Sequence, residues 1–297
     1  MPSGIFWPSA TPSCWLSAIN SPRRSPTPMS VVLGVVIAVY VSILALLFFL
    51  QRSLLFVPNR QRPDLAEAEL DAATRPIELL TADGLRLLAW YRPPPGNPGA
   101  VLLYLHGNAG HIGHRGDRVR PYLDAGFGML LLEYRGYGGN PGQPSEAGFY
   151  SDARAAFDFL LQQGVTADRV VLYGESLGTG VAVQMAVERG CGALVLEAAY
   201  TSVVAVAQSR YWMFPVRHLV LHRFDSLSKI GRVRCPVFIM HGERDRIIPI
   251  RYGRALFQAA PEPKEAKWFA DGNHTNFDEF GGPAAVLDFL KRQGVAA

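Results

Sequence analysis

The chain has 297 residues, of which 49% are hydrophobic and 11% aromatic, so it can bury a sizeable core in one or at most two domains and is not a disordered polymer. Its formal net charge is +4, and the basic residues lie in short separate segments, which argues against nucleic-acid binding. The three cysteines, Cys14, Cys191 and Cys235, are too few and too irregularly spaced for a disulfide framework.

The first sixty residues differ in composition from the rest of the chain. Residues 1–28 are rich in Ser and Pro and show no apolar periodicity, so we predict that they are disordered. Val31–Leu50 is a run of uncharged residues long enough to span a bilayer core as a helix. The alternative is a cleaved signal peptide, but its apolar region is usually only about 7–15 residues and ends in a small-residue cleavage site. The longer run and the missing cleavage motif predict a transmembrane anchor over residues 29–52.

The arginines that flank this anchor nearly balance between its two sides. Two precede the apolar run and three follow it, namely Arg23 and Arg24, then Arg52, Arg60 and Arg62. If translation starts at Met29, the upstream pair is lost, and the positive-inside rule places the remainder of the chain in the cytoplasm. We therefore expect a single-pass membrane protein with its C-terminal domain on the cytoplasmic side.

From about Pro76 onward the chain alternates between predicted strands and predicted helices. Asp83-Gly84 joins two apolar segments in a hairpin pattern. Continuous apolar runs follow, which are typical of strands buried on both faces of a parallel sheet: AVLLYLHG, GMLLLEYRG, RVVLYGES, GALVLEAAY, CPVFIMHG and, more weakly, AKWFADG. Helical patterns lie between them, starting near Ser145, after Ser176, at Arg254–Ala259 and at Ala284–Arg292. The alternation predicts one α/β domain over residues 53–297 with a mostly parallel, doubly wound sheet.

One aromatic and basic insertion, over about residues 200–228, interrupts this alternation. We predict that it forms a small helical lid over an acyl-binding pocket at the membrane surface; the alternative is that it only covers the edge of the sheet. Its His218 and His222 are four residues apart in a predicted helix, and a second group of histidines precedes it at His106, His111 and His114. Neither group has a further ligand in a suitable context, so we predict no metal and no cofactor.

A lone serine stands at a sharp strand-to-helix corner in the stretch VVLYGESLGTG. Gly174-Glu175-Ser176-Leu177-Gly178 matches G-x-S-x-G, with a predicted strand before it and a predicted helix after it. Such a turn lifts the hydroxyl above the sheet at the positive end of a helix. A serine that only caps the helix is the alternative. The context favours Ser176 as a catalytic nucleophile.

A serine hydroxyl needs a base to remove its proton, and the base needs an acid to hold it. After a G-x-S-x-G turn the chain order is serine, acid, histidine, and only His274 follows the last predicted strand. Asp245, in the loop after CPVFIMHG, is the predicted acid. Glu243 is the second choice, and Asp271 is a weaker one because it is too close to His274 in the chain.

The tetrahedral intermediate of acyl transfer needs backbone N–H donors for its oxyanion. The N–H of Leu177, directly after the nucleophile, is one expected donor. The glycine-rich loop after LLYLHG is expected to supply the other from Asn108, with Ala109 as the alternative.

Five motifs in order now resemble a known family: LHGNAGH, EYRGYGGNPGQPSEAG, LYGESLGTG, MHGERDRIIP and DGNHTN. From about Ser53 to its end, the chain resembles the serine α/β-hydrolases of the Bem46 type, and the N-terminal anchor fits as well. The resemblance implies the α/β-hydrolase fold, the triad Ser176, Asp245 and His274, and hydrolysis of an ester, thioester or amide.

The expected reaction is transfer of an acyl group to water through an acyl-enzyme on Ser176, with a small-molecule or lipid-linked acyl substrate. Two other functions stay open at this point. One is a membrane-tethered binding or scaffolding protein that kept the fold and lost the chemistry. The other is a serine peptidase, although the sequence has no large cap domain that would restrict access to peptides.

Overall fold

The computed structural model describes residues 27–96 and 99–295, so the predicted disorder of residues 1–28 lies almost entirely outside the described residues. The chain divides into two compact units, Met1–Leu47 and Phe48–Ala297. Helix α1, Pro28–Leu55, has none of its residues buried. Its most apolar window has a mean hydropathy of 3.0, which makes it long and apolar enough to cross a membrane. This confirms the predicted N-terminal helix, while its insertion in a bilayer stays a prediction.

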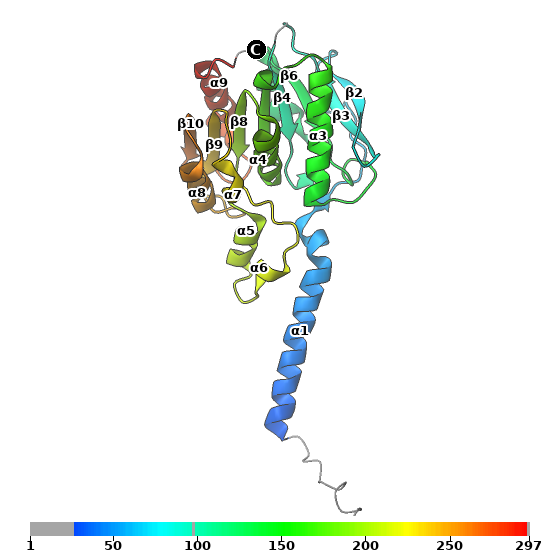
Figure 1. The fold of residues 1–297 in the computed structure, drawn as a ribbon, viewed down its shortest axis with the longest axis vertical. Coiled ribbons are helices and arrows are strands. Elements are labelled where there is room, and N and C mark those ends of the chain that lie inside the picture. Colours follow the sequence, from blue (N-terminus) through cyan, green and yellow to red (C-terminus); the bar gives the residue numbers. More distant parts are fainter. Residues whose placement is uncertain (1–26, 97–98, 296–297) are drawn as a thin grey trace, which may run out of the picture. The chain divides into compact units, whose positions relative to one another are not determined.

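The second unit is built on one eight-stranded sheet in the order β10-β9-β8-β7-β4-β6-β3-β2 (Figure 1). Neighbouring strands are parallel except where β3 pairs with β6 and with β2. The bounds are β2 Arg75–Leu80, β3 Arg86–Arg92, β4 Val101–Leu105, β6 Gly128–Leu132, β7 Val170–Glu175, β8 Ala193–Glu197, β9 Val237–Gly242 and β10 Lys264–Phe269. The predicted hairpin at Asp83-Gly84 and the predicted mostly parallel sheet are both confirmed.

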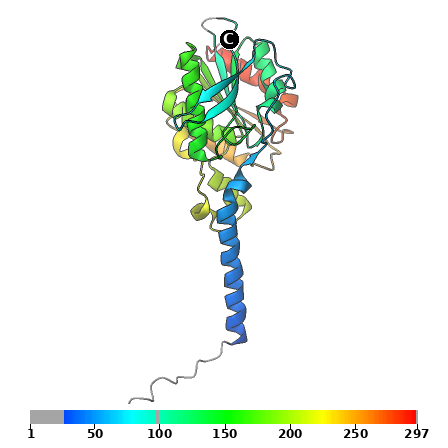
Figure 2. The same cartoon turned by 90° about the vertical axis from the view of Figure 1, so that its right-hand side faces the viewer.

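Helices cover both faces of this sheet, and each face has its own apolar core. The helices of the second unit are α2 Gly116–Asp124, α3 Glu146–Gln162, α4 Leu177–Arg189, α5 Val203–Arg210, α6 Val216–Leu219, α7 Leu227–Ile230, α8 Arg251–Ala259 and α9 Gly282–Arg292. Side chains of α3, α4, α7 and α8 belong to one core, and those of α2 and α9 belong to the other. Figure 1 shows α3 and α4 in front of the sheet, and Figure 2 shows the sheet between its two layers of helices.

Helix α3 illustrates how the sequence determines these elements. The Ser145 hydroxyl accepts a hydrogen bond from the backbone N–H of Gly148 and so caps the first turn. The residues three and four apart that form its apolar stripe, including Phe149, Ala153 and Phe157, are buried against the sheet.

Two features of the fold differ from the expectation. Helix α2 was not predicted, because its sequence GDRVRPYLD is mostly polar and contains Pro121. The insertion contains α5, α6 and α7, but α6 ends at Leu219. His218 lies in α6 but His222 does not, so the prediction that both histidines lie in one helix was wrong.

A short segment after α1 pairs with the loop that follows β4. Strand β1, Val57–Pro58, runs parallel to β5, Ala109–Gly110, in a separate two-stranded sheet. Phe56, just before it, is buried against the rings of Phe149 and Phe224. The polypeptide that leaves α1 is therefore part of the core of the second unit.

Candidate functional site

The turn at Ser176 has the strained geometry that its sequence predicts. Strand β7 ends at Glu175, helix α4 begins at Leu177, and Ser176 between them has φ +49°. A non-glycine residue with positive φ is strained, and such strain is tolerated where the surrounding structure holds the turn in place. A Cβ atom at Gly178 would overlap the carbonyl of Leu105, and one at Gly174 would overlap the start of α4. Glycine on both sides thus lets strand and helix approach closely enough to form the turn.

Three side chains that are far apart in the chain meet at the carboxyl ends of the strands. The Ser176 hydroxyl donates to Nε2 of His274, with Oγ and Nε2 3.0 Å apart. Nδ1–H of His274 donates to Oδ2 of Asp245 over 2.7 Å, because a carboxylate only accepts. Asp245 follows β9 and His274 follows β10, so the parallel sheet brings all three to one edge. The structure therefore brings together Ser176, His274 and Asp245, the three residues that the sequence analysis selected as candidates.

Asp245 is held so that its second oxygen is also satisfied. Oδ1 accepts the backbone N–H groups of Ile247 and Ile248, each at 2.8 Å. Nε2 of His241 lies 3.3 Å from Oδ2 and 2.8 Å from the carbonyl oxygen of Ile248. Burial raises the pKa of Asp245, but hydrogen bonds from His241 and His274 outweigh it and hold this pKa well below its usual range. The carboxylate of Asp245 therefore stays charged and can accept the hydrogen bond from Nδ1–H of His274.

The two alternative acids pair with arginines and not with His274. Glu243 pairs with Arg254 at 2.8 Å, and Asp271 pairs with Arg244 at 2.5 Å. Both carboxylates are partly exposed to solvent. Neither contacts the imidazole, so the geometry favours Asp245 over both.

The two expected oxyanion donors line the same pocket as Ser176 and His274. Leu177 is the first residue of α4, where a backbone N–H has no partner within the helix. Asn108 lies between β4 and β5, and its side-chain Oδ1 accepts from the N–H of Val57 and the hydroxyl of Tyr137, each at 3.1 Å. Ala109, the alternative donor, lines the pocket as well. The segment after α1 thus helps to hold the loop that carries the second expected donor.

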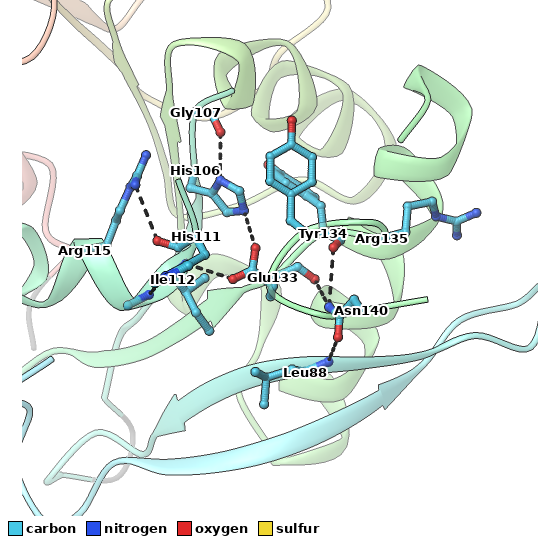
Figure 3. A network of polar contacts seen from close by, with 12 residues as sticks. Leu88, His106, Gly107, His111, Ile112, Arg115, Glu133, Tyr134, Arg135 and Asn140 are labelled. Atoms are coloured by element: carbon cyan, nitrogen blue, oxygen red, sulfur yellow. Dashed lines mark hydrogen bonds and ion pairs between the residues drawn. The ribbon is translucent and has the colours of Figure 1, made fainter. Parts of the chain in front are cut away.

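A buried carboxylate, which the sequence analysis missed, supports both ends of this loop (Figure 3). Oε1 of Glu133 lies 3.2 Å from Nε2 of His106, and Oε2 accepts the N–H of Ile112 over 2.9 Å. Nδ1 of His106 lies 2.8 Å from the carbonyl oxygen of Gly107. The one signal in the sequence was a charged residue at the end of the otherwise apolar run GMLLLEYRG. Glu133 therefore contacts both ends of the loop that follows β4, at His106 and at Ile112.

Two further ion pairs with buried carboxylates tie the loops around Ser176 and His274 to the sheet. Arg115 donates to both carboxylate oxygens of Glu175, at 2.8 and 3.0 Å, and to the carbonyl oxygen of Ala109 at 3.0 Å. Arg118 pairs with Glu197 at 2.7 Å and donates to the carbonyl oxygen of Thr275 at 2.5 Å. The first pair links the turn at Ser176 to the loop between β4 and β5, and the second links β8 to the loop of His274.

The pair of Glu175 and Arg115 predicts a specific pH dependence of stability. Burial raises the pKa of Glu175, but the charge and hydrogen bonds of Arg115 outweigh it and lower this pKa to about 2 from an ordinary value of 4.5. Its contribution to stability is complete above pH 4.5 and is lost as the pH falls through 2. Glu175→Gln leaves Arg115 buried and unpaired, so at pH 7 we expect it to lower the unfolding free energy by about 3–5 kcal/mol.

Denaturant unfolding of wild type and Glu175→Gln at several pH values measures this effect. The difference between the two should shrink as the pH falls from 4.5 toward 2. Glu78→Gln is the control, because Glu78 and its partner Arg86 are both exposed and their pair should contribute about 1 kcal/mol or less. A difference that stays constant down to pH 2 is incompatible with the ion pair as its cause.

The pocket at this site has a volume of about 770 Å³ and combines a polar end with an apolar wall. Ser176, His274, Asn108 and Leu177 line the polar end. The apolar lining comes from the last turn of α1, from α5 and from the loop after β9, namely Leu54, Leu55, Val203, Val206, Ala207, Ile247 and Ile248. The insertion thus contributes a wall of the pocket. Among the described residues, no group of three or more His, Cys, Asp or Glu side chains is arranged to hold a metal ion.

Known proteins resemble this chain in both sequence and structure. The chain matches the family described as serine aminopeptidase, S33, over residues 96–227. It is 36% identical over 263 residues to an uncharacterized protein of Mycobacterium tuberculosis, a match that covers 88% of this chain and 93% of that protein. It is also 32% identical over 196 residues to the lysophosphatidylserine lipase ABHD12 of Danio rerio, covering 59% of this chain and 51% of that protein.

Among solved structures, an esterase of Pyrococcus furiosus, Pf2001, matches with a TM-score of 0.64 at 18% identity. The match covers 80% of this chain and 97% of that esterase. At this level of identity the likeness shows the fold alone. It confirms the fold class that was predicted from the sequence.

Proposed function

Because this chain belongs to the α/β-hydrolase family and is a hydrolase, we propose that it is a serine esterase that works through an acyl-enzyme on Ser176. One observation carries the proposal: hydrogen bonds join Ser176, His274 and Asp245 in a chain at the polar end of an apolar pocket. Asn108 and Leu177 supply the oxyanion donors in this proposal. No cofactor and no metal take part in it.

The reaction proceeds in two half-reactions of the same kind. Oγ of Ser176 attacks the substrate carbonyl while Nε2 of His274 takes its proton, and Asp245 stabilises the imidazolium that forms. The tetrahedral intermediate collapses, the imidazolium gives its proton to the leaving alcohol or thiol, and the acyl group stays on Ser176. Water then attacks the acyl-enzyme with the same base, which releases the acid and restores the serine.

The substrate in this proposal is an ester or thioester with an apolar acyl chain. The apolar wall of the pocket supports this, since it offers an acyl chain a surface that excludes water. The name of the Danio rerio relative, a lysophosphatidylserine lipase, supports an acyl ester as well. The 28-residue helix α1 supports membrane anchoring, and the five sequence motifs support assignment to the Bem46 type. The catalytic unit lies on the cytoplasmic side in this proposal, which follows from the arginines after the helix when translation starts at Met29.

A peptidase is the second candidate, because the matching family is described as serine aminopeptidase. The test uses the full chain in lipid nanodiscs with three sets of substrates: p-nitrophenyl esters of increasing acyl length, acyl thioesters, and aminoacyl p-nitroanilides. We expect hydrolysis of the esters, with kcat/KM that rises with acyl length up to the capacity of the pocket. Hydrolysis of the anilides alone would favour the peptidase. A folded protein that cleaves none of the three would favour a binding or scaffolding role.

A further inference from the structure

The insertion carries an exposed apolar segment over residues 211–221. Four of its large hydrophobic side chains face solvent: Tyr211 is 42% exposed, Trp212 75%, Met213 64% and Leu221 62%. Soluble proteins rarely leave such residues clustered on a short segment unless they contact a partner or a membrane. Figure 1 shows α5 and α6, which lie before and after residues 211–213, projecting from the sheet.

The charge of the same segment selects the kind of partner. Residues 203–223 contain Arg210, Arg217 and Arg223 and no Asp or Glu, and all three arginines are exposed. We call the exposed side chains of residues 210–213, 217, 221 and 223 the 210–223 surface. Apolar and aromatic side chains next to arginines fit the interface of a bilayer that contains anionic lipids.

A pair of hydrogen bonds places this surface at the level of a bilayer interface. Nε2 of Gln51 donates to the carbonyl oxygen of Leu219 over 3.2 Å, and Oε1 of Gln51 accepts the N–H of Leu221 over 2.8 Å. Gln51 directly follows the uncharged run Val31–Leu50. If that run spans the hydrocarbon core, Gln51 lies at its edge, and the segment that is bonded to Gln51 lies there too.

The same surface borders the pocket. Arg210 and Tyr211 line the pocket as well as the surface, and Leu54 and Leu55 line it from the last turn of α1. Ser176 and two residues of the 210–223 surface therefore line one and the same pocket.

We propose that the 210–223 surface docks the catalytic unit on an anionic bilayer, and that the pocket takes its acyl substrate directly from that bilayer. This inference rests on the proposed function, because it assumes the membrane anchor and the site at Ser176. It adds the substrate class: acyl amphiphiles that reside in a membrane. A second copy of the chain is the other possible occupant of the surface, and the test below distinguishes it.

Fluorescence quenching tests the docking without any use of catalysis. The full chain is placed in nanodiscs with brominated phosphatidylcholine, with and without phosphatidylglycerol. The difference between wild type and Trp212→Phe isolates the emission of Trp212. We expect brominated lipid to quench this emission at least about twofold, and more strongly when anionic lipid is present. Trp268, on β10, is the control residue, whose emission, isolated with Trp268→Phe, should not respond to brominated lipid.

Activity then tests the route of the substrate. The variant Trp212→Glu/Met213→Glu/Leu221→Glu should lower kcat/KM on a long-chain ester embedded in nanodiscs on the order of tenfold. Its kcat/KM on water-soluble p-nitrophenyl acetate should stay within about twofold of wild type. Leu80→Glu/Leu161→Glu is the matched control, since these leucines are also exposed but belong to β2 and α3, and it should retain both activities.

The outcomes separate this inference from the proposed function. If wild type cleaves p-nitrophenyl acetate but Trp212 is not quenched, the docking is wrong and the hydrolase assignment stands. If Trp212 is quenched but no ester is cleaved, the proposed function is wrong and the docking stands. If the triple variant also loses its activity on p-nitrophenyl acetate, the quenching of Trp212 in wild type decides whether the docking is right. A dimer that disappears in the triple variant, together with unquenched Trp212, would assign the surface to a second copy instead.

Discussion

Ser176→Ala is expected to lower kcat for p-nitrophenyl butyrate by roughly 10⁴–10⁶-fold. The substitution removes the atom that forms the acyl-enzyme, and the remaining pocket, imidazole and N–H donors assist only a direct attack by water. The fold should persist, because alanine meets the same backbone strain at φ +49° and loses only one hydroxyl. Steady-state hydrolysis by purified full-length protein, together with its melting temperature, measures both effects.

Ser228→Ala is the matched control for this experiment. Ser228 is exposed, and its hydroxyl donates to the carbonyl oxygen of Asp225, away from the pocket. We expect this variant to keep wild-type activity. If the Ser176→Ala protein is folded and retains more than about a hundredth of wild-type kcat, another group is the nucleophile.

Asp245→Asn is expected to lower kcat by about 10⁴-fold while the fold is kept. The carboxylate accepts the Nδ1–H of His274 over 2.7 Å and thereby leaves Nε2 free to accept the serine proton. An amide cannot stabilise the imidazolium, and where its NH₂ group faces Nδ1 it selects the tautomer whose Nε2 is already protonated. KM should change much less than kcat, because Asp245 acts on the base and not on the bound acyl chain.

Glu243→Gln separates this effect from a general loss of negative charge after β9. Glu243 is two residues away from Asp245 and pairs with Arg254 near the surface. Its substitution should change kcat by no more than a few-fold. If Glu243→Gln costs more activity than Asp245→Asn, the assignment of the acid is reversed.

The sequence was informative where chemistry depends on order along the chain or on local strain. Glycines at 174 and 178 indicate a turn that tolerates no side chain two residues before or after Ser176, and the structure shows the backbone contacts that require them. Uninterrupted apolar runs indicate strands that are buried on both faces, and they became the parallel strands of the sheet. The order serine, acid, histidine then limited the partners of Ser176 to few candidates.

The residues that support the site could not be predicted from the sequence, because their roles depend on contacts between distant segments of the chain. Glu133 and Ile112 are 21 residues apart, and nothing in the apolar run before Glu133 reveals its partner. Arg115 and Glu175 are 60 residues apart, and Arg115 precedes α2, the helix whose polar sequence concealed it. Charged residues in short polar stretches usually face solvent, so only the fold shows that these are buried.

The structure gives the physical reason for preferring Asp245, which was the predicted acid, to Glu243. Glu243 and Asp245 lie in one loop with the same charge, and either one satisfies the chain order. Two backbone N–H groups, from Ile247 and Ile248, hold Oδ1 of Asp245 and turn Oδ2 toward His274. The local turn after β9, and not the residue type, thus decides which carboxylate reaches the imidazole.

The residue that carries the covalent intermediate can be mapped directly. The full-length protein is treated with a fluorophosphonate, digested with trypsin and analysed by tandem mass spectrometry. We predict a single phosphonate adduct on Ser176 in the tryptic peptide of residues 170–189, which is prevented by heat denaturation before labelling and absent from Ser176→Ala. An adduct on a different serine of the folded protein, or the same extent of labelling in Ser176→Ala, would show that Ser176 is not the nucleophile.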